Sequence, residues 1–441
     1  MEISQAFMCL ESFGVLLPEI LIPAAGIDIG EWAVIACDQY TSEPEYWNRA
    51  ARIAEGKPSA LHCILPELYL HSDRADSAIA AIKNTMKDYL ARGILRPLPP
   101  GLILVDRKTP FHKSRRGVAL ALDMEHYDYK PGSQSLIRPT EGTIVERLPP
   151  RVKIRRDAAL ELSHVMVLID DPKNELMGEL FDMAAGETPV YEGELMLGGG
   201  SVTGRWLSAE KAAPHLAESL SVLSRGAGNL LFAMGDGNHS LATAKAVWEE
   251  TKPSLSAQQR KNHPLRYALA EVVNLYDPGL EFHAIHRIIK EINPADFFSF
   301  LRGKPGFTLE TTSSADETAA LCAAGRGPDT FTAGLLSRGE YAVIRFRKAG
   351  AIIPTGIIQS LIEEFQGAHG GKIDYIHGGD SLFALSAGEN TAGLLLPALS
   401  EDKLFPAVIQ DGVLPRKTFS LGEAPEKRFY LEGRRIGWSP A

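Results

Sequence analysis

An apolar run meets a polar, glycine-rich turn at residues 230–240, LLFAMGDGNHS. The apolar half has the length and composition of a buried strand, and residues 241–248, LATAKAVW, continue with a helical pattern. Gly235 and Gly237 permit a left-handed backbone and the close approach of a ligand. A strand, a tight turn and a helix N-terminus in this order direct backbone N–H groups and the positive end of a helix dipole at one point. The stretch therefore predicts an anion-binding turn.

Acid–base side chains lie in the same turn. Asp236 and His239 can hydrogen-bond or exchange protons, and Asn238 or Ser240 can cap the helix. The alternative is a plain capping turn with His239 as a polar neighbour, which leaves so many special residues in so short a stretch unexplained. We expect Asp236 and His239 to be catalytic. The residues expected to hold phosphate are Gly235, Gly237, Asn238 and Ser240.

Composition indicates a globular chain of two or three packed units. The 441 residues exceed what one core ordinarily organises, and 45% apolar with 23% charged residues is typical of globular proteins. The net charge of −9 disfavours broad binding to nucleic acid or an anionic membrane. Scattered cysteines without a CxxC pair indicate neither a zinc site nor a disulfide framework. With no basic segment at the start and no apolar run of membrane-spanning length, a cytoplasmic location is expected.

Strand and helix patterns alternate along the chain, which predicts a mixed α/β fold. Strands are expected at residues 32–37, 117–123, 164–169 and 265–275, with a hairpin around residues 198–200. Helices are expected at residues 76–92 and from about residue 157. The expected units are an N-terminal α/β segment at 1–145, a central phosphate-binding unit at 146–290 and a C-terminal α/β segment at 291–441.

Five positive charges fall within residues 147–156. If this part is extended, Arg151, Lys153 and Arg155 share one face and direct three cations at one anion. The alternative is a solvated face in which the cations pair with neighbouring carboxylates, namely Glu146, Asp157 and Glu161. The cations expected to bind phosphate are Arg138, Arg147, Arg151, Lys153 and Arg155.

Three carboxylates are further candidates for the chemistry. Asp170 and Asp171 follow an apolar run and offer the oxygen ligands that Mg²⁺ prefers beside phosphate. A turn before Pro172 is the alternative for this pair, since Asp is common there. Glu141, in the polar stretch 138–143 (RPTEGT), is a general-base candidate.

Histidines and a basic pair in the C-terminal half are weaker candidates. His283 and His286 have the spacing of one helical face, but the sequence offers no third metal ligand. His377 is a second acid–base candidate, with a capped turn as its alternative. Arg416 and Lys417 are a further candidate phosphate contact, although isolated basic pairs usually lie on the surface. The remaining histidines stand alone and are expected to have no function.

Residues 236–239, Asp-Gly-Asn-His, resemble the D-G-x-H-R element of the ParB, sulfiredoxin and free serine kinase superfamily. The resemblance implies that the turn and the helix start bind nucleotide phosphates in a central ParB-like mixed-sheet unit. Ser240 stands where that element has arginine, and serine cannot supply the bidentate contacts of a guanidinium. A phosphate bound here therefore needs a cation from elsewhere, and we expect it from Arg151, Lys153 and Arg155.

Further segments carry a longer resemblance. They read ACDQYT at 36–41, IRPTEGT at 137–143, RLPPR at 147–151, VLIDDP at 167–172, DGNH at 236–239 and LPRK at 414–417. Together they are similar to an uncharacterised bacterial and archaeal family called domain of unknown function 1015, over nearly the whole chain. That resemblance implies no particular activity.

These patterns favour an enzyme that binds a nucleotide, such as ATP or ADP, or another phosphorylated small molecule. It would transfer or hydrolyse a phosphoryl group with Mg²⁺, which Asp236 or Asp170 would position. No GxxxxGK[ST], GxSxG, HExxH or strand-linked GxGxxG motif is present, so a P-loop enzyme, an α/β-hydrolase and a zincin are not expected. Two alternatives stay open: a non-catalytic ParB-like nucleotide sensor or nucleic-acid adaptor, and a structural protein. Substrate identity and oligomeric state leave no signal in the sequence.

Overall fold

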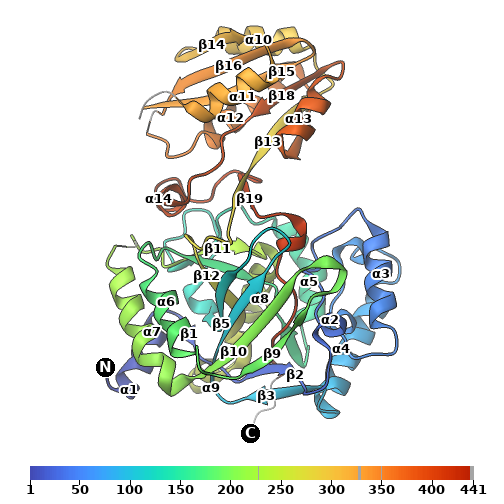
Figure 1. The fold of residues 1–441 in the computed structure, drawn as a ribbon, viewed down its shortest axis with the longest axis vertical. Helices are drawn as coiled ribbons and strands as arrows, with labels where there is room; N and C mark the ends of the chain where they lie inside the picture. Colours follow the sequence, from blue (N-terminus) through green and yellow to red (C-terminus); the bar gives the residue numbers. More distant parts are fainter. Residues whose placement is uncertain (227, 326–328, 349, 438–441) are drawn as a thin grey trace. The chain divides into compact units, whose positions relative to one another are not determined.

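The computed structural model of the chain describes residues 1–226, 228–325, 329–348 and 350–437. The chain forms two compact units (Figure 1). The larger unit comprises Met1–Leu280 and Gly422–Ala441, and the smaller unit comprises Glu281–Leu421. The boundary expected after residue 145 falls within the larger unit, and the one expected after residue 290 lies ten residues beyond the boundary at residue 280. The end of the chain returns to the larger unit, which a linear division of the sequence does not anticipate.

A mixed sheet organises the larger unit, with strand order β6-β11-β8-β12-β5-β4-β10-β9 and β1 paired to β5. The strands are β1 (Val15–Leu16), β4 (Gly101–Lys108), β5 (Arg115–Asp123), β6 (Ile137–Arg138), β8 (Met166–Ile169), β9 (Pro189–Glu194), β10 (Ser201–Ser208), β11 (Phe232–Asp236) and β12 (Tyr267–Asn274). The pairs β6–β11 and β8–β12 are parallel, and the other pairs of this sheet are antiparallel. The expected mixed α/β class is confirmed.

Both faces of this sheet are covered, because successive side chains of a strand point to opposite faces. On β4, Leu102 and Leu104 belong to one apolar core, and Ile103 and Val105 belong to another. The helices that contribute to the first core are α1 (Ile3–Ser12), α6 (Glu175–Met183), α7 (Ala209–Ser224) and α8 (Asn238–Thr251). Those in the second core are α2 (Ile29–Trp32), α3 (Pro44–Ala54) and α4 (Ala75–Ala91). Figure 1 shows α6 and α7 at one side of the sheet and α2 to α4 at the other.

A second, small sheet ties the end of the chain into the larger unit. Its order is β3-β2-β20-β7. The strands are β2 (Ile20–Pro23), β3 (Leu95–Leu98), β7 (Leu160–Leu162) and β20 (Gly433–Arg435). The short helices α5 (Leu148–Arg155) and α9 (Ala257–Asn262) complete this unit. Because β20 lies between β2 and β7, the segment before it, residues 422–432, is held inside the larger unit.

The smaller unit has its own antiparallel sheet, with order β14-β16-β15-β18-β13-β17 and β19 paired to β13. Its strands are β13 (Phe282–Lys290), β14 (Phe307–Thr312), β15 (Thr330–Ser337), β16 (Glu340–Arg347), β17 (Lys372–His377), β18 (Thr391–Leu395) and β19 (Phe419–Leu421). Its helices are α10 (Pro294–Arg302), α11 (Ala315–Ala324), α12 (Thr355–His369), α13 (Gly379–Ser386) and α14 (Glu401–Asp411). Side chains from α10, α12 and the sheet form its main core.

Two local predictions are wrong. The strand expected at 32–37 is absent: residues Ile29–Trp32 are helical, started by the Asp28 carboxylate that accepts from Gly30 N, and Ile35 makes only an isolated bridge to Phe429. The helix expected from about residue 157 is also wrong, because α5 ends at Arg155 and β7 follows. A short apolar run fits a buried strand and a buried helix equally, so periodicity alone could not separate them.

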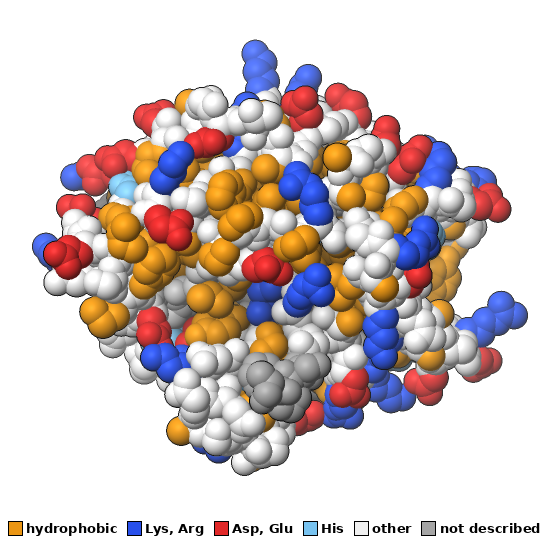
Figure 2. Space-filling model, turned by 90° about the horizontal axis from the view of Figure 1, so that it is seen from below, with side chains coloured by type: hydrophobic (Ala, Val, Ile, Leu, Met, Phe, Trp, Pro, Cys, Tyr) orange, Lys and Arg blue, Asp and Glu red, His pale blue; other side chains and the backbone are white. Residues whose placement is uncertain are grey.

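The surface mixes charges of both signs. Figure 2 shows Lys and Arg interspersed with Asp and Glu on the face that it displays, with apolar side chains between them. Among the helices of the described residues, none has both the length and the apolar character needed to cross a bilayer.

Candidate functional site

The glycine-rich turn joins β11 to α8 as predicted. Gly237 occupies the N-cap position of α8 with φ of +78°, and a Cβ there would lie 3.1 Å from Val165 Cα. The positive φ favours glycine, and the close contact adds to that preference. The Gly237 carbonyl accepts from Ser240 N at 2.9 Å and from Leu241 N at 3.1 Å, which starts the helix. Gly237 has no side chain with which to cap this helix, and the positive end of the α8 dipole points out of the turn.

The loop that carries Glu141 runs beside this turn. β6 is the parallel neighbour of β11, with Arg138 in register with Ala233, so both chains leave the sheet at the same edge. Thr140 Oγ1 donates to the carbonyl of Met234 at 2.8 Å, which holds the loop against the end of β11. Glu141 follows directly. The structure therefore brings the predicted general base to the predicted phosphate turn.

Arg138 is buried on the strand next to the turn, with 3% of its surface exposed. Its Nη1 donates to the carbonyl of Ser133 at 3.3 Å. Within the described residues, Nε and Nη2 have no hydrogen-bond acceptor. The carbonyl oxygen Oδ1 of the Asn238 side chain is likewise buried without a partner among them. Buried polar groups normally find partners, so these atoms indicate where a ligand would bind.

Asp236 is held by a cation that the sequence analysis missed. Its Oδ1 accepts from Gly237 N at 2.9 Å, and its Oδ2 lies 3.4 Å from Lys427 Nζ. Burial raises the pKa of Asp236, but the charges of Lys427 and His164 outweigh it and hold the pKa below its ordinary value. Asp236 is therefore ionised at neutral pH, and Lys427 places a positive charge beside the turn.

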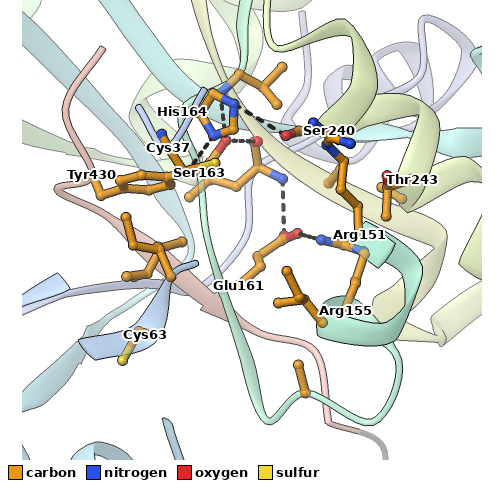
Figure 3. A pocket seen from close by; sticks show the side chains of 18 of the residues that line it. Cys37, Cys63, Arg151, Arg155, Glu161, Ser163, His164, Ser240, Thr243 and Tyr430 are labelled. Atoms are coloured by element: carbon orange, nitrogen blue, oxygen red, sulfur yellow. Dashed lines mark hydrogen bonds and ion pairs between the residues drawn. The ribbon is translucent and has the colours of Figure 1, made fainter. Parts of the chain in front are cut away.

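A second group of polar side chains surrounds His164, which is 4% exposed. Its Nδ1 lies 2.7 Å from the hydroxyl of Tyr430, and its Nε2 lies 3.2 Å from Oγ of Ser240. Nε2 also lies 3.8 Å from a carboxylate oxygen of Asp38. Figure 3 shows His164 between Tyr430 and Ser240. The serine that replaces the arginine of the D-G-x-H-R element thus contacts an imidazole.

This group is not a nucleophilic triad. In a Ser–His–Asp triad the hydroxyl and the carboxylate bond to different ring nitrogens, whereas Ser240 and Asp38 both lie at Nε2 of His164. The neighbouring thiol of Cys37 is also unsuited to attack, because burial, together with the charge of Asp38, raises its pKa to about 12. Only a thiolate is an effective nucleophile.

The basic run lies on a helix, so the extended arrangement predicted for it is wrong. α5 covers Leu148–Arg155 and has proline in its first turn, where proline favours a helix start. Residues four apart share a helical face. Arg151 and Arg155 therefore lie together, and Lys153 points elsewhere, exposed and paired with Asp76 at 3.1 Å.

Four of the five cations of this run are ion-paired, which agrees with the alternative interpretation. Arg151 Nη2 lies 2.8 Å from Glu67, and Arg155 Nη1 lies 2.5 Å from Glu161. Of the carboxylates expected as partners, Glu161 takes part. Arg147 is exposed, and its carbonyl accepts from Arg151 Nη1.

Arg151 and Arg155 nevertheless share a cavity of about 140 Å³ with Ser240 and His164 (Figure 3). The cavity is bounded by α4, α5 and α8, by β7 and by the returning segment that carries Tyr430. Arg151 and Arg155, predicted to act near the turn, both line a cavity that the turn residue Ser240 also lines.

The pair Asp170–Asp171 does not reach this site. β8 is antiparallel to β11, with Met166 opposite Asp236, so the residues that follow β8 lie at the other end of β11. Asp171 Oδ1 accepts from Glu175 N, and Oδ2 accepts from Leu176 N, so this carboxylate caps α6. Asp171 therefore lies in a turn, as the alternative to a Mg²⁺ site predicted. Both oxygens of its carboxylate accept from backbone N–H groups.

The candidates in the C-terminal half belong to the smaller unit. His283 and His286 lie on β13, a strand, where positions three apart face opposite sides, so the shared helical face predicted for them is wrong. His286 Nδ1 accepts from Leu396 N at 3.2 Å. The ring of His377 packs against that of His283 at 5.2 Å.

The basic pair near the end of the smaller unit has a structural role. The carbonyls of Arg416 and Lys417 accept from the guanidinium of the fully buried Arg287, at 3.1 and 2.9 Å. The backbone at this pair thus holds a buried cation of its own unit.

His164, Tyr430 and Lys427 are the site residues that sequence reasoning missed. The position of His164 at the start of an apolar strand was a weak indication of a role. The prediction that isolated histidines have no function excluded it. Tyr430 and Lys427 had none, because only the return of the chain end to the larger unit brings them to the turn.

The family model for Protein of unknown function (DUF1015) matches residues 21–352. No curated protein matches the chain. Among solved structures, a conserved hypothetical protein from Pyrococcus furiosus is similar with a TM-score of 0.35 and 10% identity, over 69% of this chain and 90% of that one. A free serine kinase variant in complex with ADP has a TM-score of 0.39 and 9% identity, over 72% and 92%. SbnI from Staphylococcus aureus has a TM-score of 0.34 and 8% identity, over 69% and 82%.

Proposed function

This chain belongs to the family described as Protein of unknown function (DUF1015), and we propose that it binds a nucleotide such as ADP or ATP, or another phosphorylated small molecule, and transfers or hydrolyses its phosphoryl group. One observation carries the proposal. The start of α8 and the loop after β6, which carries Glu141, leave the sheet at the same edge and are joined by the hydrogen bond from Thr140 to Met234.

The phosphate lies at the turn in this proposal. The N–H groups of Asn238 and His239 and the positive end of the α8 dipole face it. Lys427, 3.4 Å from Asp236, supports the proposal because it supplies the positive charge that Ser240 lacks. The two buried N–H groups of Arg138 without acceptors in the described residues add donors on the neighbouring strand.

Glu141 or His239 takes the proton. An acceptor hydroxyl or water attacks the terminal phosphorus, its O–P bond forms, and the bond to the leaving phosphate oxygen breaks. The proton of the attacking oxygen passes to Glu141 or His239, and the nucleotide leaves one phosphate shorter. Mg²⁺ bound with the nucleotide would neutralise the phosphate oxygens. Where His239 is the base, the carboxylate of Glu141 would offer this ion an oxygen ligand, since hard cations take oxygen ligands and keep several waters; both oxygens of Asp236 are already bonded, to Gly237 N and Lys427.

Binding and turnover test the proposal together. We expect ADP or ATP with Mg²⁺ to raise the melting temperature and to bind in calorimetry, and ³¹P NMR to record loss of the terminal phosphate. His239→Ala and Glu141→Gln should reduce turnover at least tenfold. Asp170→Asn, at the far end of β11, is the matched control and should leave it unchanged. If no member of a panel of nucleotides and sugar phosphates binds the wild type, the proposal fails.

The nucleic-acid adaptor is not proposed, because four of the five cations of the basic run that favoured it are paired with carboxylates.

A further inference from the structure

The cavity beside α5 has the size and lining of a binding site for a small organic molecule. Apolar side chains make up most of its wall, among them Cys63, Leu70, Met86, Leu162 and Ile436. Its volume of about 140 Å³ is close to that of cavities that hold benzene, which corresponds to roughly six to ten non-hydrogen atoms. The polar groups in its wall determine which class of small molecule the cavity would bind.

Arg155 offers two buried donors at this wall. Its side chain is 13% exposed, and Nη1 is bonded to Glu161. Among the described residues, no acceptor lies within hydrogen-bond distance of Nε or Nη2. A guanidinium with two buried N–H groups left over matches a carboxylate in geometry and charge.

Glu161 does not neutralise this guanidinium fully, because it serves two other donors. It accepts from Leu269 N at 3.0 Å and from Arg434 Nε at 2.9 Å. Arg155 and Arg434 together carry two positive charges against the single charge of Glu161. Glu161 is therefore shared between Arg155 at the cavity wall and Arg434 behind it, so the charge of Arg155 is only partly balanced and a ligand anion would balance the rest.

Ser240 adds a donor of its own. In the tautomer of His164 whose Nδ1 accepts from the Tyr430 hydroxyl, 2.7 Å away, that hydroxyl still accepts from Cys37 N at 3.4 Å. The ring proton then lies on Nε2, which donates to Ser240 Oγ at 3.2 Å. The hydroxyl proton of Ser240 is left to donate into the cavity that Ser240 lines.

We propose that this cavity binds a small organic acid with an apolar body, whose carboxylate is held by Nε and Nη2 of Arg155. Ser240 donates to a further oxygen where the acid has one. The polar groups identified here, two N–H groups and one O–H group, are all donors, so the site selects for acceptors. The proposal does not depend on phosphate binding at the turn.

The test uses hexanoate and benzoate as probes, with hexanamide and benzamide as neutral counterparts of the same shape, in the full chain without nucleotide or Mg²⁺. Calorimetry or saturation-transfer NMR should show each acid binding at least tenfold more tightly than its amide. Arg155→Met should remove this preference. Arg156→Met, an exposed neighbour paired with Glu250, should keep it.

Every outcome decides the proposal. Equal affinity for acid and amide, no binding of either, or an unchanged preference in Arg155→Met would overturn it. If Arg155→Met does not fold, the acid-to-amide affinity ratio is compared between the wild type and Arg155→Lys. Lysine keeps the charge but lacks the two parallel N–H donors, so the preference for the acid should be lost. His239→Ala should leave acid binding unchanged, so failure of the phosphoryl-transfer proposal and failure of this one are distinguishable.

Discussion

The hydroxyl of Tyr430 lies 2.7 Å from Nδ1 of His164, a contact that joins positions 266 residues apart. It connects the returning end of the chain to the start of β8. On the other side of the ring, Nε2 faces Ser240 at the start of α8. One phenol therefore contacts an imidazole that lies beside both the turn and the cavity.

Replacement of Tyr430 by phenylalanine should lower the free energy of unfolding. The change leaves His164 Nδ1 and Cys37 N without their partner inside the larger unit, and a buried group left unpaired costs about 1–3 kcal/mol. We expect a loss of that size in the free energy of unfolding, measured by urea denaturation. Tyr69→Phe, the same change at a half-buried position, is the control. Equal stabilities of the two variants would contradict the assignment.

Gly237→Ala should destabilise the turn. The φ of +78° is costly for alanine, and the new Cβ would lie 3.1 Å from Val165 Cα, a backbone atom that cannot move freely. Strain of this kind costs about 1–3 kcal/mol, and the displaced helix start should also weaken nucleotide binding. Differential scanning calorimetry measures the first effect and titration the second. Gly186→Ala, with an ordinary φ and open space around it, should leave both unchanged.

The turn could be predicted because its signals are local. Residues 230–240 carry a strand pattern, two glycines and a helix pattern in succession, and each is read from neighbours in sequence. The helix at 76–92 and the strands at 117–123 and 265–275 follow from the same periodicity and are confirmed as α4, β5 and β12. Short apolar runs without a clear period, such as 32–37, were not predictable in this way.

The rest of the site depends on contacts over long distances in sequence. Lys427 reaches Asp236 only because β20 pairs with β2 and β7 and draws the segment before it inside. The helical conformation of the basic run could have been predicted from its own residues, because Pro149 and Pro150 favour a helix start. A helix separates Lys153 from Arg151 and Arg155.

Glu161 should make the larger unit sensitive to acid. Burial raises the pKa of Glu161, but Arg155 and Arg434 outweigh it and hold the pKa below its ordinary value. The unfolded chain, with an ordinary pKa of about 4.3, then binds the proton more readily than the folded chain. The stability from this group is present above that pH and is lost as the pH falls through the lower, folded pKa.

Glu161→Gln should remove this part of the acid dependence and, at pH 7, cost about 3–5 kcal/mol, because it leaves two buried guanidiniums without their carboxylate. Urea denaturation between pH 3 and pH 7 checks both effects. Glu218→Gln, at an exposed position of α7, should change neither. An unaltered pH profile in Glu161→Gln would show that other groups cause acid unfolding.

His286 should make the smaller unit less stable in acid, as Glu161 does for the larger unit, but for a different reason. Burial, with the charges of His377 and Arg287 adding to it, lowers the pKa of His286 to about 4. Its Nδ1 accepts from Leu396 N, a bond that a protonated ring cannot make. In the unfolded chain the pKa is about 6.5, so the unfolded state binds more protons between these values, and stability falls as the pH drops from about 6.5 towards 4. With ¹³C-labelled histidine, NMR should record a ring that stays neutral at pH 5.5 and whose signal vanishes in His286→Gln. A ring that titrates near 6.5 would show that His286 is hydrated rather than buried against β18.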